Sequence, residues 1–185
     1  ERVPEVMMIE TERLILRQIV PADAEEIFAF SKGPETGRDA GWKPHETLEE
    51  TRLIMQEIFL EQESVFGMVL KETGVMIGSV GLIDDPLREN DSVRMLGYAL
   101  GEEFWGQGYM TEAAGAVIGY GFEEMHLDLI SATCYPFNLR SKRVLEKLGF
   151  RYEGTLALAE KRYDGKVLDK DCFSVTKEAY FHKRG

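Results

Sequence analysis

The stretch that most constrains the fold is a predicted strand, a glycine-bearing loop and a predicted helix in direct succession over residues 96–122. A glycine-containing turn that leads into a helix directs several backbone N–H groups at one point, and the helix dipole adds positive potential there. Gly106 and Gly108 have no side chain to keep the backbone away from a phosphate. Neither a Walker loop nor a dinucleotide fingerprint is present. By itself the loop fits either an anion site or a plain structural turn.

The rest of the chain divides into further predicted elements, whose order predicts an α/β fold with a mixed sheet and helices on its faces. The predicted strands are 12–20, 65–72, 75–85, 92–104, 128–136, 150–163 and 166–178. The predicted helices are 21–31, 47–62, 111–125 and 138–149.

Several local signals set the boundaries of these elements. Thr73-Gly74 and Asp164-Gly165 are hairpin-type turns. Thr47 followed by Glu50 predicts a capping box at the start of a helix. The glycine- and proline-rich segment 32–46 is predicted to be a 15-residue loop, a length that points to function.

Composition narrows the function classes. A chain of 185 residues favours one domain, and the longest apolar runs are too short to span a membrane. The acidic start does not resemble a signal peptide, and two cysteines without metal-ligand spacing favour a reducing compartment and no metal site. We therefore expect a cytoplasmic protein. A formal charge of −11 argues against nucleic-acid binding and modestly favours a cationic partner.

Two separated motifs are similar to those of one enzyme family. EEFWGQGYMTEA (102–113) is followed, after one predicted helix and one predicted strand, by NLRSKRVLEKLGFRYEG (138–154). In this order and spacing they resemble the GCN5-related N-acetyltransferases (GNAT), and most of all the branch of bacterial ribosomal-protein N-terminal acetyltransferases of the RimJ/RimL type. The resemblance covers nearly the whole chain, from residue 10 to residue 177.

The resemblance implies one N-acetyltransferase domain over residues 1–185, with residues 1–8 set apart as either disordered or foreign to the natural protein. Its sheet is expected to be mixed and mostly antiparallel, flanked by helices. A splayed central strand pair is expected to form the acetyl-CoA cleft, with a bulge near Leu100-Gly101.

The resemblance also assigns residues to acetyl-CoA, the expected co-substrate. The first motif places the family's phosphate loop on residues 105–110, where Trp105 and Met110 depart from the usual residue types. The strand before it is expected to pair with the pantetheine arm. The cofactor-binding residues expected from both motifs are Tyr98, Ala99, Leu100, Gly106, Gln107, Gly108, Tyr109, Met110, Thr111, Asn138 and Arg143.

Two of these assignments have plain structural alternatives. Asn138 stands at the start of its predicted helix, where it is also an ordinary N-cap. Residues 138–151 carry five Lys or Arg against Glu146, hence 5 − 1 = +4. This basic island, with Arg143 as its expected contact, suits the phosphates of coenzyme A as well as it suits a solvated helix face.

The catalytic residues follow from the resemblance with less support from the pattern. Many acetyltransferases of this superfamily carry a tyrosine acid seven residues after the asparagine, where this chain has Leu145. Ser141 is the expected substitute on the leaving thiolate, and Glu160 the expected base on the acceptor amine. A surface serine and a solvated glutamate are the alternatives. Trp42 in segment 32–46 either borders the acceptor cleft or is packed in the loop.

The sequence therefore predicts an acetyl-CoA-dependent N-acetyltransferase that transfers an acetyl group directly to a primary amine, foremost a protein N-terminal α-amine. A polyamine or antibiotic amine is the alternative acceptor, and a non-catalytic acyl-CoA-binding module is the alternative class. We expect no metal, no membrane and no nucleic acid among its partners, and a homodimer as an open possibility.

Overall fold

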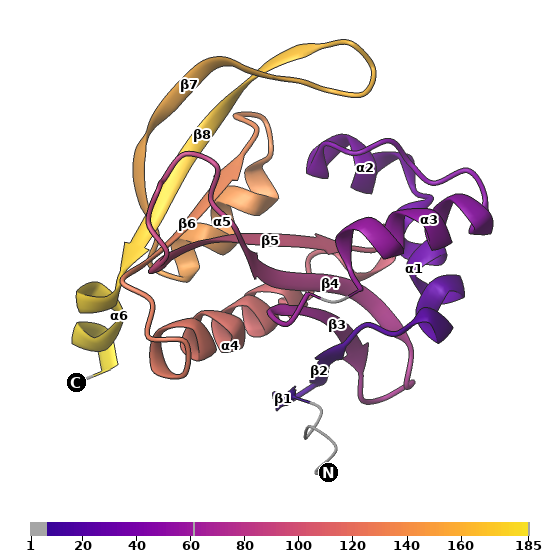
Figure 1. Cartoon of the computed structure of the whole chain (residues 1–185), viewed down its shortest axis with the longest axis horizontal. Helices are drawn as coiled ribbons and strands as arrows, with labels where there is room; N and C mark the ends of the chain where they lie inside the picture. Colours follow the sequence, from indigo (N-terminus) through magenta and orange to yellow (C-terminus); the bar gives the residue numbers. More distant parts are fainter. Residues whose placement is uncertain (1–6, 61, 185) are drawn as a thin grey trace.

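Eight strands form one sheet in the order β1-β2-β3-β4-β5-β6-β8-β7 (Figure 1). The computed structural model describes residues 7–60 and 62–184. The strands are β1 (Met8–Glu10), β2 (Leu14–Gln18), β3 (Val65–Leu70), β4 (Met76–Ile83), β5 (Val93–Leu100), β6 (Leu129–Cys134), β7 (Arg151–Lys161) and β8 (Val167–Thr176). The expectation for residues 1–8 falls mainly on residues 1–6, outside the described residues.

Helices cover both faces of this sheet. They are α1 (Ala24–Ser31), α2 (Pro34–Ala40), α3 (Leu48–Ile58), α4 (Tyr109–Glu123), α5 (Leu139–Lys147) and α6 (Lys177–Arg184), with short 3-10 turns η1 (Pro21–Asp23) and η2 (Glu102–Phe104). One buried cluster lies between the sheet and α4, and a second packs α1 and α3 against strands β3 and β4. The mixed α/β architecture predicted from the element order is confirmed.

The central strands β5 and β6 are the one parallel pair in the described part of the chain, and they separate after a short contact. Residues 93–95 of β5 pair with residues 129–131 of β6. Beyond that point β5 runs on to Leu100 and β6 to Cys134 without pairing to each other. The predicted splay is confirmed, and it opens the sheet between these strands.

The bulge predicted near Leu100-Gly101 is wrong. The register of β5 on β4 is continuous from Met95 to Leu100, and the Gly101 N–H still donates to Ile77 O at 3.0 Å. The splay therefore needs no extra residue in β5. It arises because β6 leaves β5 and continues its pairing with β8 instead.

Segment 32–46 is not a loop throughout, because it contains α2. Pro34 takes the first helical position and Gly41 ends the helix with a left-handed φ of 91°. The Glu102 carboxylate accepts hydrogen bonds from the N–H groups of Glu35 and Thr36 at the start of α2. Proline at the start and glycine at the end are helix signals, and the cap comes from a residue 67 positions away.

Other local predictions hold. Thr47 Oγ1 accepts a hydrogen bond from the Glu50 N–H at 3.1 Å. The Glu50 carboxylate accepts from Glu46 N–H rather than from Thr47, so the predicted capping box is half formed. Gly121 of α4 faces the sheet, where an added Cβ would lie 2.8 Å from Leu82 Cδ1. A side chain at this position would have to displace the end of the Leu82 side chain, so glycine lets the helix pack closely on the sheet.

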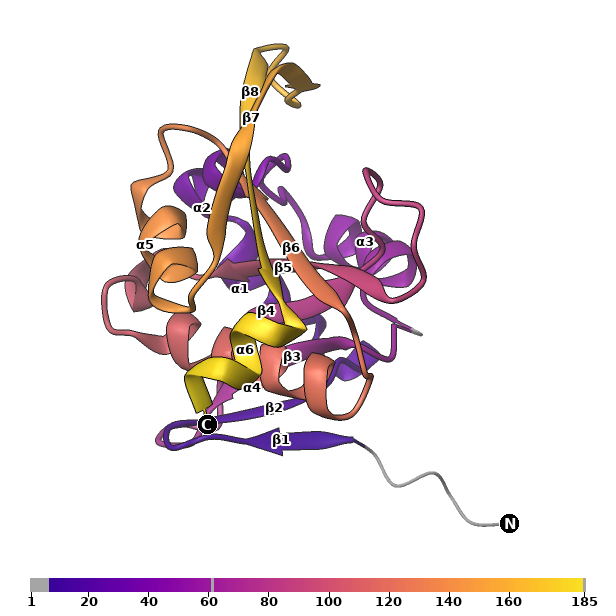
Figure 2. The ribbon, with the colours of Figure 1, turned by 90° about the vertical axis from the view of Figure 1, so that its left-hand side faces the viewer.

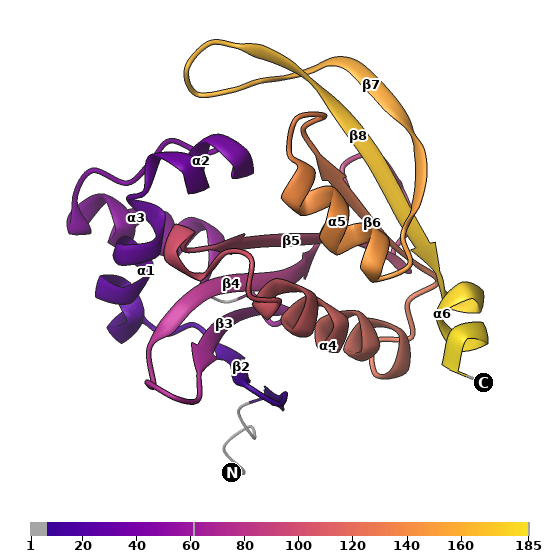
Figure 3. The ribbon, with the colours of Figure 1, turned by 180° about the vertical axis from the view of Figure 1, so that it is seen from behind.

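The β7–β8 hairpin projects from the body of the fold, as Figure 2 shows. Viewed from behind in Figure 3, its tip approaches α2, while α4 and α5 lie on the near side of the sheet. The hairpin and α2 thereby stand on either side of the opening between β5 and β6.

Candidate active site

A cleft of about 500 Å³ occupies the space where β5 and β6 diverge. It is lined by the end of β5, the loop into α4, the end of β6, one face of α5, and parts of α2, β7 and β8. It collects the predicted residues Tyr98, Ala99, Leu100, Gly106, Gly108, Tyr109, Met110, Thr111, Asn138, Ser141, Arg143 and Glu160. Gln107 does not line it, and its side chain donates to Glu103 O instead.

The loop at one end of the cleft presents main-chain donors. Gly106 and Gly108 adopt left-handed φ angles of 75° and 80°. Within residues 7–60 and 62–184, no hydrogen-bond acceptor is found for the N–H groups of residues 106–111, and Gly108 provides no side-chain cap for α4. A Cβ built on Gly106 would meet nothing within 4 Å. Unpaired N–H groups beside open space at a helix N-terminus are suited to a phosphate.

Arg13 of the segment before β2 braces this loop from outside. Its Nη1–H donates to Gln107 O at 2.9 Å, and its Nε forms an ion pair with Glu112 at 2.8 Å. The guanidinium also lies over the Tyr109 ring, 4.2 Å from its centre. These contacts hold the loop in place without using its N–H groups.

The free side of β5 forms a wall of the cleft. Because Gly101 pairs with β4, the alternation of an antiparallel strand turns the backbone groups of Tyr98 and Leu100 away from β4. The Leu100 carbonyl accepts a hydrogen bond from Trp105 Nε1 at 2.9 Å. The Arg140 guanidinium lies over the Trp105 ring, 3.4 Å from the ring centre.

The start of α5 brings two polar side chains to the middle of the cleft. Asn138 Oδ1 accepts from the Ser141 N–H at 3.1 Å, so Asn138 is a helix N-cap as well as a cleft residue. The buried Ser141 side chain hydrogen-bonds the Tyr98 hydroxyl across the opening. Burial raises the pKa of Tyr98 above its ordinary value, which keeps this phenol protonated.

The basic island divides into paired and unpaired charges. Arg140 pairs with Asp39 of α2, and Lys142 pairs with Asp171 of β8 at 2.8 Å. Arg143 and Lys147 line the cleft and form no ion pair within the described part of the chain. These two cations are thus available to an anionic ligand.

Glu160 lies at the other end of the cleft, next to a register shift in β7. Its carboxylate accepts a hydrogen bond from the Tyr135 hydroxyl, and Lys170 Nζ lies 3.3 Å away. Burial and the adjacent carboxylate raise the pKa of Tyr135. Sequence reasoning missed both partners, although the Asp164-Gly165 turn already places Lys170 close to Glu160 across the hairpin.

The C-terminal end of α2 closes over this end of the cleft. Asp39 and Ala40 line the cleft, and the Asp39 carbonyl lies 3.4 Å from Asn138 Nδ2. From the hairpin, Arg162 Nη1 donates to Arg38 O at 3.2 Å. Treating this segment as a loop hid these residues from sequence analysis.

Three other side chains with functional potential lie outside the cleft or are neutral within it. Trp42 does not line the cleft, and its buried Nε1 has no acceptor among the described residues. His45 is buried and hydrogen-bonds Thr51 through Nδ1. Cys134 lines the cleft, but burial raises its pKa to about 11, so its thiol is neutral.

Two structural surveys complete the description. No group of three or more His, Cys, Asp or Glu side chains in the described residues is arranged to hold a metal ion. None of the described helices combines the length and apolar character needed to cross a membrane.

Comparisons with protein families, sequences and solved structures all match this chain to acetyltransferases. The sequence profile of the acetyltransferase (GNAT) domain matches residues 13–151. An N-acetyltransferase of Bacillus licheniformis named p20 is 34% identical, with 92% of this chain and 96% of the relative covered. The [ribosomal protein uS5]-alanine N-acetyltransferase of Escherichia coli is 32% identical, with 82% and 81% covered. A GNAT-family crystal structure from Bacillus anthracis superimposes with a TM-score of 0.81 at 26% identity, covering 93% of this chain and 99% of that one.

Proposed function

The chain belongs to the acetyltransferase (GNAT) family, and on this basis we propose that it transfers the acetyl group of acetyl-CoA directly to the α-amine of a protein N-terminus. Acetyl-CoA supplies a thioester that an amine nitrogen can attack. The observation that carries the proposal is the cleft itself, which has unpaired main-chain N–H groups at one end and a carboxylate at the other.

The loop end suits the pyrophosphate of acetyl-CoA. Residues 106–111 offer N–H donors at a helix N-terminus, and Arg143 and Lys147 add positive charge nearby. On the free side of β5, the backbone groups of Tyr98 and the N–H of Leu100 can pair with the amides of an extended ligand arm, as in strand addition. These features support the cofactor residues assigned from the sequence, with Gln107 acting through its backbone.

The Glu160 end suits an amine. An α-amine has a pKa of about 7.7–8.0 and is partly neutral at pH 7, whereas a lysine-like amine near 10.4 is almost wholly protonated. A carboxylate held by Tyr135 and Lys170 can accept the proton that the nitrogen loses, directly or through one water. We assign Glu160 this role and the binding of the amine.

Ser141 lies between the two ends and is assigned to the leaving thiolate. Its hydroxyl is a hydrogen-bond donor at the N-terminus of α5, where the helix dipole favours negative charge. A donor fixed before reaction stabilises the charge that develops on sulfur when the C–S bond breaks.

The choice of acceptor draws on one relative. The Escherichia coli protein at 32% identity is named for acetylating an alanine of ribosomal protein uS5. An N-terminal α-amine is also partly neutral at pH 7, so it needs less help from a base than a lysine-like amine does. Such an acceptor assigns the reaction to the cytoplasm, where ribosomal proteins are made.

An acceptor screen tests the proposal. Release of the coenzyme A thiol is followed with N-terminal peptides, N-terminally blocked peptides containing lysine, polyamines and aminoglycosides. We expect unblocked peptides to give the highest kcat/KM. A preference for polyamines or aminoglycosides would contradict the acceptor, and tight acetyl-CoA binding without turnover on any amine would favour a binding module.

Glu160→Gln tests the assigned base. We expect kcat/KM for the peptide to fall about 100-fold, the low end of general-base contributions, while the Kd for acetyl-CoA stays within about twofold because the loop end is untouched. Glu153→Gln is the matched control, since Glu153 is on the same strand and outside the cleft. Equal activity of both variants would remove Glu160 from the mechanism.

We also propose that the protein forms a homodimer. β7 is an edge strand whose side chains are nearly all exposed, and it presents the apolar Leu156 and Leu158 to solvent. An exposed apolar edge strand is a surface on which another chain can pair. Sedimentation analysis is expected to give a dimer, and a monomer at all concentrations would contradict this.

A further inference from the structure

We propose that Tyr98 positions the Ser141 hydroxyl so that the serine proton points into the cleft, toward the sulfur of the departing thiolate. The inference rests on the proposed function and deepens it by adding a second hydroxyl to the leaving-group site. The sequence prediction assigns Tyr98 to the cofactor as part of the strand beside the pantetheine arm, and gives its hydroxyl no role.

The contact joins two elements that the splay of the sheet separates. Tyr98 comes from the part of β5 that pairs with β4 and no longer with β6. Ser141 comes from the first turn of α5, 43 residues further along the chain. Their hydroxyls hydrogen-bond each other inside the cleft that both residues line.

The chemistry of the two hydroxyls sets the direction of this bond. Each carries one proton and two lone pairs. A phenol, with a pKa near 10, is a stronger donor than an aliphatic alcohol, and burial keeps Tyr98 protonated. Among the described residues, the only other oxygen that accepts a hydrogen bond from the Tyr98 hydroxyl is the Ser141 carbonyl at 3.5 Å, a poor partner. Tyr98 therefore donates to Ser141 Oγ, which leaves the serine proton free.

Two contacts then fix Ser141. Its N–H donates to Asn138 Oδ1, which holds the backbone, and the Tyr98 hydroxyl holds the side-chain oxygen. A hydroxyl restrained at both points loses little freedom when charge develops on sulfur, which is the condition for preorganised stabilisation.

The contact between Tyr98 and Ser141 also compensates for the absence of the tyrosine that the family usually carries on α5. Leu145 occupies that position and is fully buried in the core, so that turn of α5 offers no hydroxyl. Tyr98 brings a phenol to the leaving group from the opposite side, through Ser141. The chain thus places a tyrosine beside the thiolate site by a different strand.

The reaction step balances without a proton leaving Tyr98. The amine nitrogen forms a bond to the carbonyl carbon, the C–S bond breaks, and its electron pair stays on sulfur. The nitrogen loses a proton to Glu160, and the thiolate accepts the Ser141 hydrogen bond until it takes a proton from water. Because a thiol has a pKa of about 8.5, a well-placed donor suffices and Tyr98 is a positioning residue.

The first test measures binding without turnover. The Kd values of coenzyme A and of desulfo-coenzyme A, which lacks the sulfur, are measured between pH 7 and pH 9.5. If Ser141 donates to the thiolate, binding lowers the pKa of the coenzyme A thiol. For each unit by which this pKa falls, wild type gains about tenfold in affinity for coenzyme A relative to the analogue. We expect Ser141→Ala to abolish this gain and Tyr98→Phe to remove most of it.

The second test is a double-mutant cycle on turnover. Tyr98→Phe is expected to lower kcat about tenfold with KM for acetyl-CoA within twofold, because only a charge-stabilising hydrogen bond is weakened. In the Ser141→Ala background the same change is expected to cost nothing further. Tyr120→Phe is the control, since Tyr120 lies outside the cleft and its hydroxyl has no partner in the described residues.

The outcomes separate this inference from the function it rests on. An unchanged thiolate preference in Tyr98→Phe, or equal losses of kcat in both backgrounds, overturns the positioning role. A thiolate preference that depends on Tyr98 while no amine is acetylated supports the positioning role and overturns the proposed function alone. Failure of wild type to bind coenzyme A overturns both.

Discussion

At the 106–111 end of the cleft the polar groups are main-chain N–H donors from one continuous segment, whereas at the Glu160 end they are side chains drawn from α2, β6, β7 and β8. The first end is braced by Arg13 and depends on two glycines in left-handed conformations. The second depends on pairings such as Tyr135 with Glu160, made across long sequence distances.

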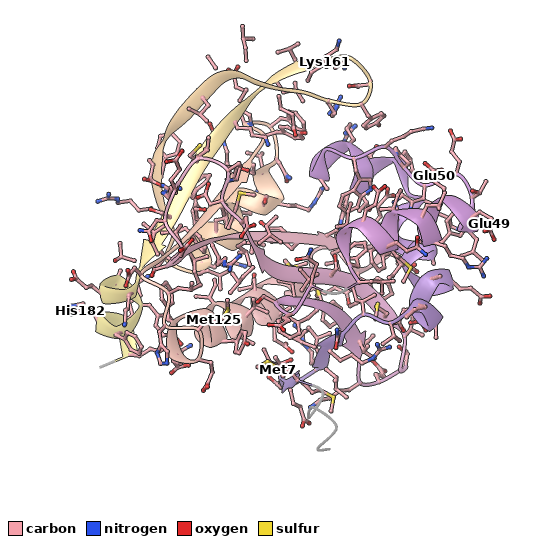
Figure 4. All side chains as sticks on the ribbon, viewed as in Figure 1. Met7, Glu49, Glu50, Met125, Lys161 and His182 are labelled. Carbon is pink, nitrogen blue, oxygen red and sulfur yellow. The ribbon has the colours of Figure 1, made fainter. Side chains whose placement is uncertain are left out.

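Under the proposed function, this difference allows one fold to keep the same acetyl donor while its amine acceptor varies. Backbone donors bind any ligand with the same phosphates, provided that the loop conformation is retained. Side chains on α2 and the hairpin can be exchanged without disturbing that loop. Figure 4 shows Lys161 on the hairpin, apart from Glu49 and Glu50 of α3. Three predictions test whether the two ends are independent, and a fourth concerns the stability of the fold.

The largest expected effect is the loss of acetyl-CoA affinity when a side chain is added to the glycine loop. Gly106→Val is expected to weaken acetyl-CoA binding about 100-fold, because its side chain fills the open space beside the N–H donors and each lost charge-assisted bond is worth roughly 1.5–3 kcal/mol. Gly74→Val is the matched control, since Gly74 has a similar φ of 73° and open space, but lies in the β3–β4 turn. Calorimetry and thermal unfolding measure both.

Similar losses of stability in the two variants are expected, because each forces a side chain into a left-handed conformation. Only Gly106→Val is expected to lose affinity for acetyl-CoA. If both variants bind acetyl-CoA as wild type does, the loop is a structural turn.

The second prediction concerns the contact between the hairpin and α2. Arg162→Gln removes the bond to Arg38 O, and we expect KM for the peptide acceptor to rise about tenfold, the equivalent of one charged hydrogen bond. The Kd for acetyl-CoA should stay within about twofold because the loop end is separate. Lys161→Gln is the control, since the exposed Lys161 makes no ion pair within the described residues. A matching loss of acetyl-CoA affinity would contradict the independence of the ends.

The third prediction concerns charge at the loop end. Replacing Arg143 and Lys147 together by Gln is expected to weaken acetyl-CoA binding about fivefold at low salt, because exposed ion pairs contribute about 1 kcal/mol or less. The difference should shrink as salt is raised. Arg151→Gln is the control, a cation of the same island outside the cleft. A loss that persists at high salt would indicate direct hydrogen bonds instead.

The smallest expected effect concerns the pH dependence of stability and a buried histidine outside the cleft. Burial lowers the pKa of His45, next to α3, below its unfolded value of 6.5, opposed by the nearby Glu50. Between the folded and unfolded values the unfolded chain binds more protons, so stability is full above pH 6.5 and falls as pH decreases. His45→Gln is expected to flatten this decrease in urea unfolding measured at pH 7.5 and pH 5.5. An unchanged pH dependence would exclude His45 as its source.

Features that depend on residues close together in the sequence were predictable, and features that depend on residues far apart in the sequence were not. The loop, its glycines and the start of α4 were predictable because consecutive residues determine backbone conformation. The hairpin turns and the Thr47 cap were predictable for the same reason. The sequence does not predict α2 because glycine and proline in and around it are typical of loops, and because its N-terminal cap, Glu102, lies far along the chain.

The sequence by itself determined the α/β class, the family and the position of the glycine loop before α4, since those depend on local pattern and on motifs within short segments. Only the tertiary structure decided that β6 leaves β5 without a bulge. It alone also decided that Tyr98 reaches Ser141 and that α2 meets the hairpin. These contacts depend on which side chains the splayed sheet brings together, and no periodicity along one segment records a distance between segments more than 40 residues apart.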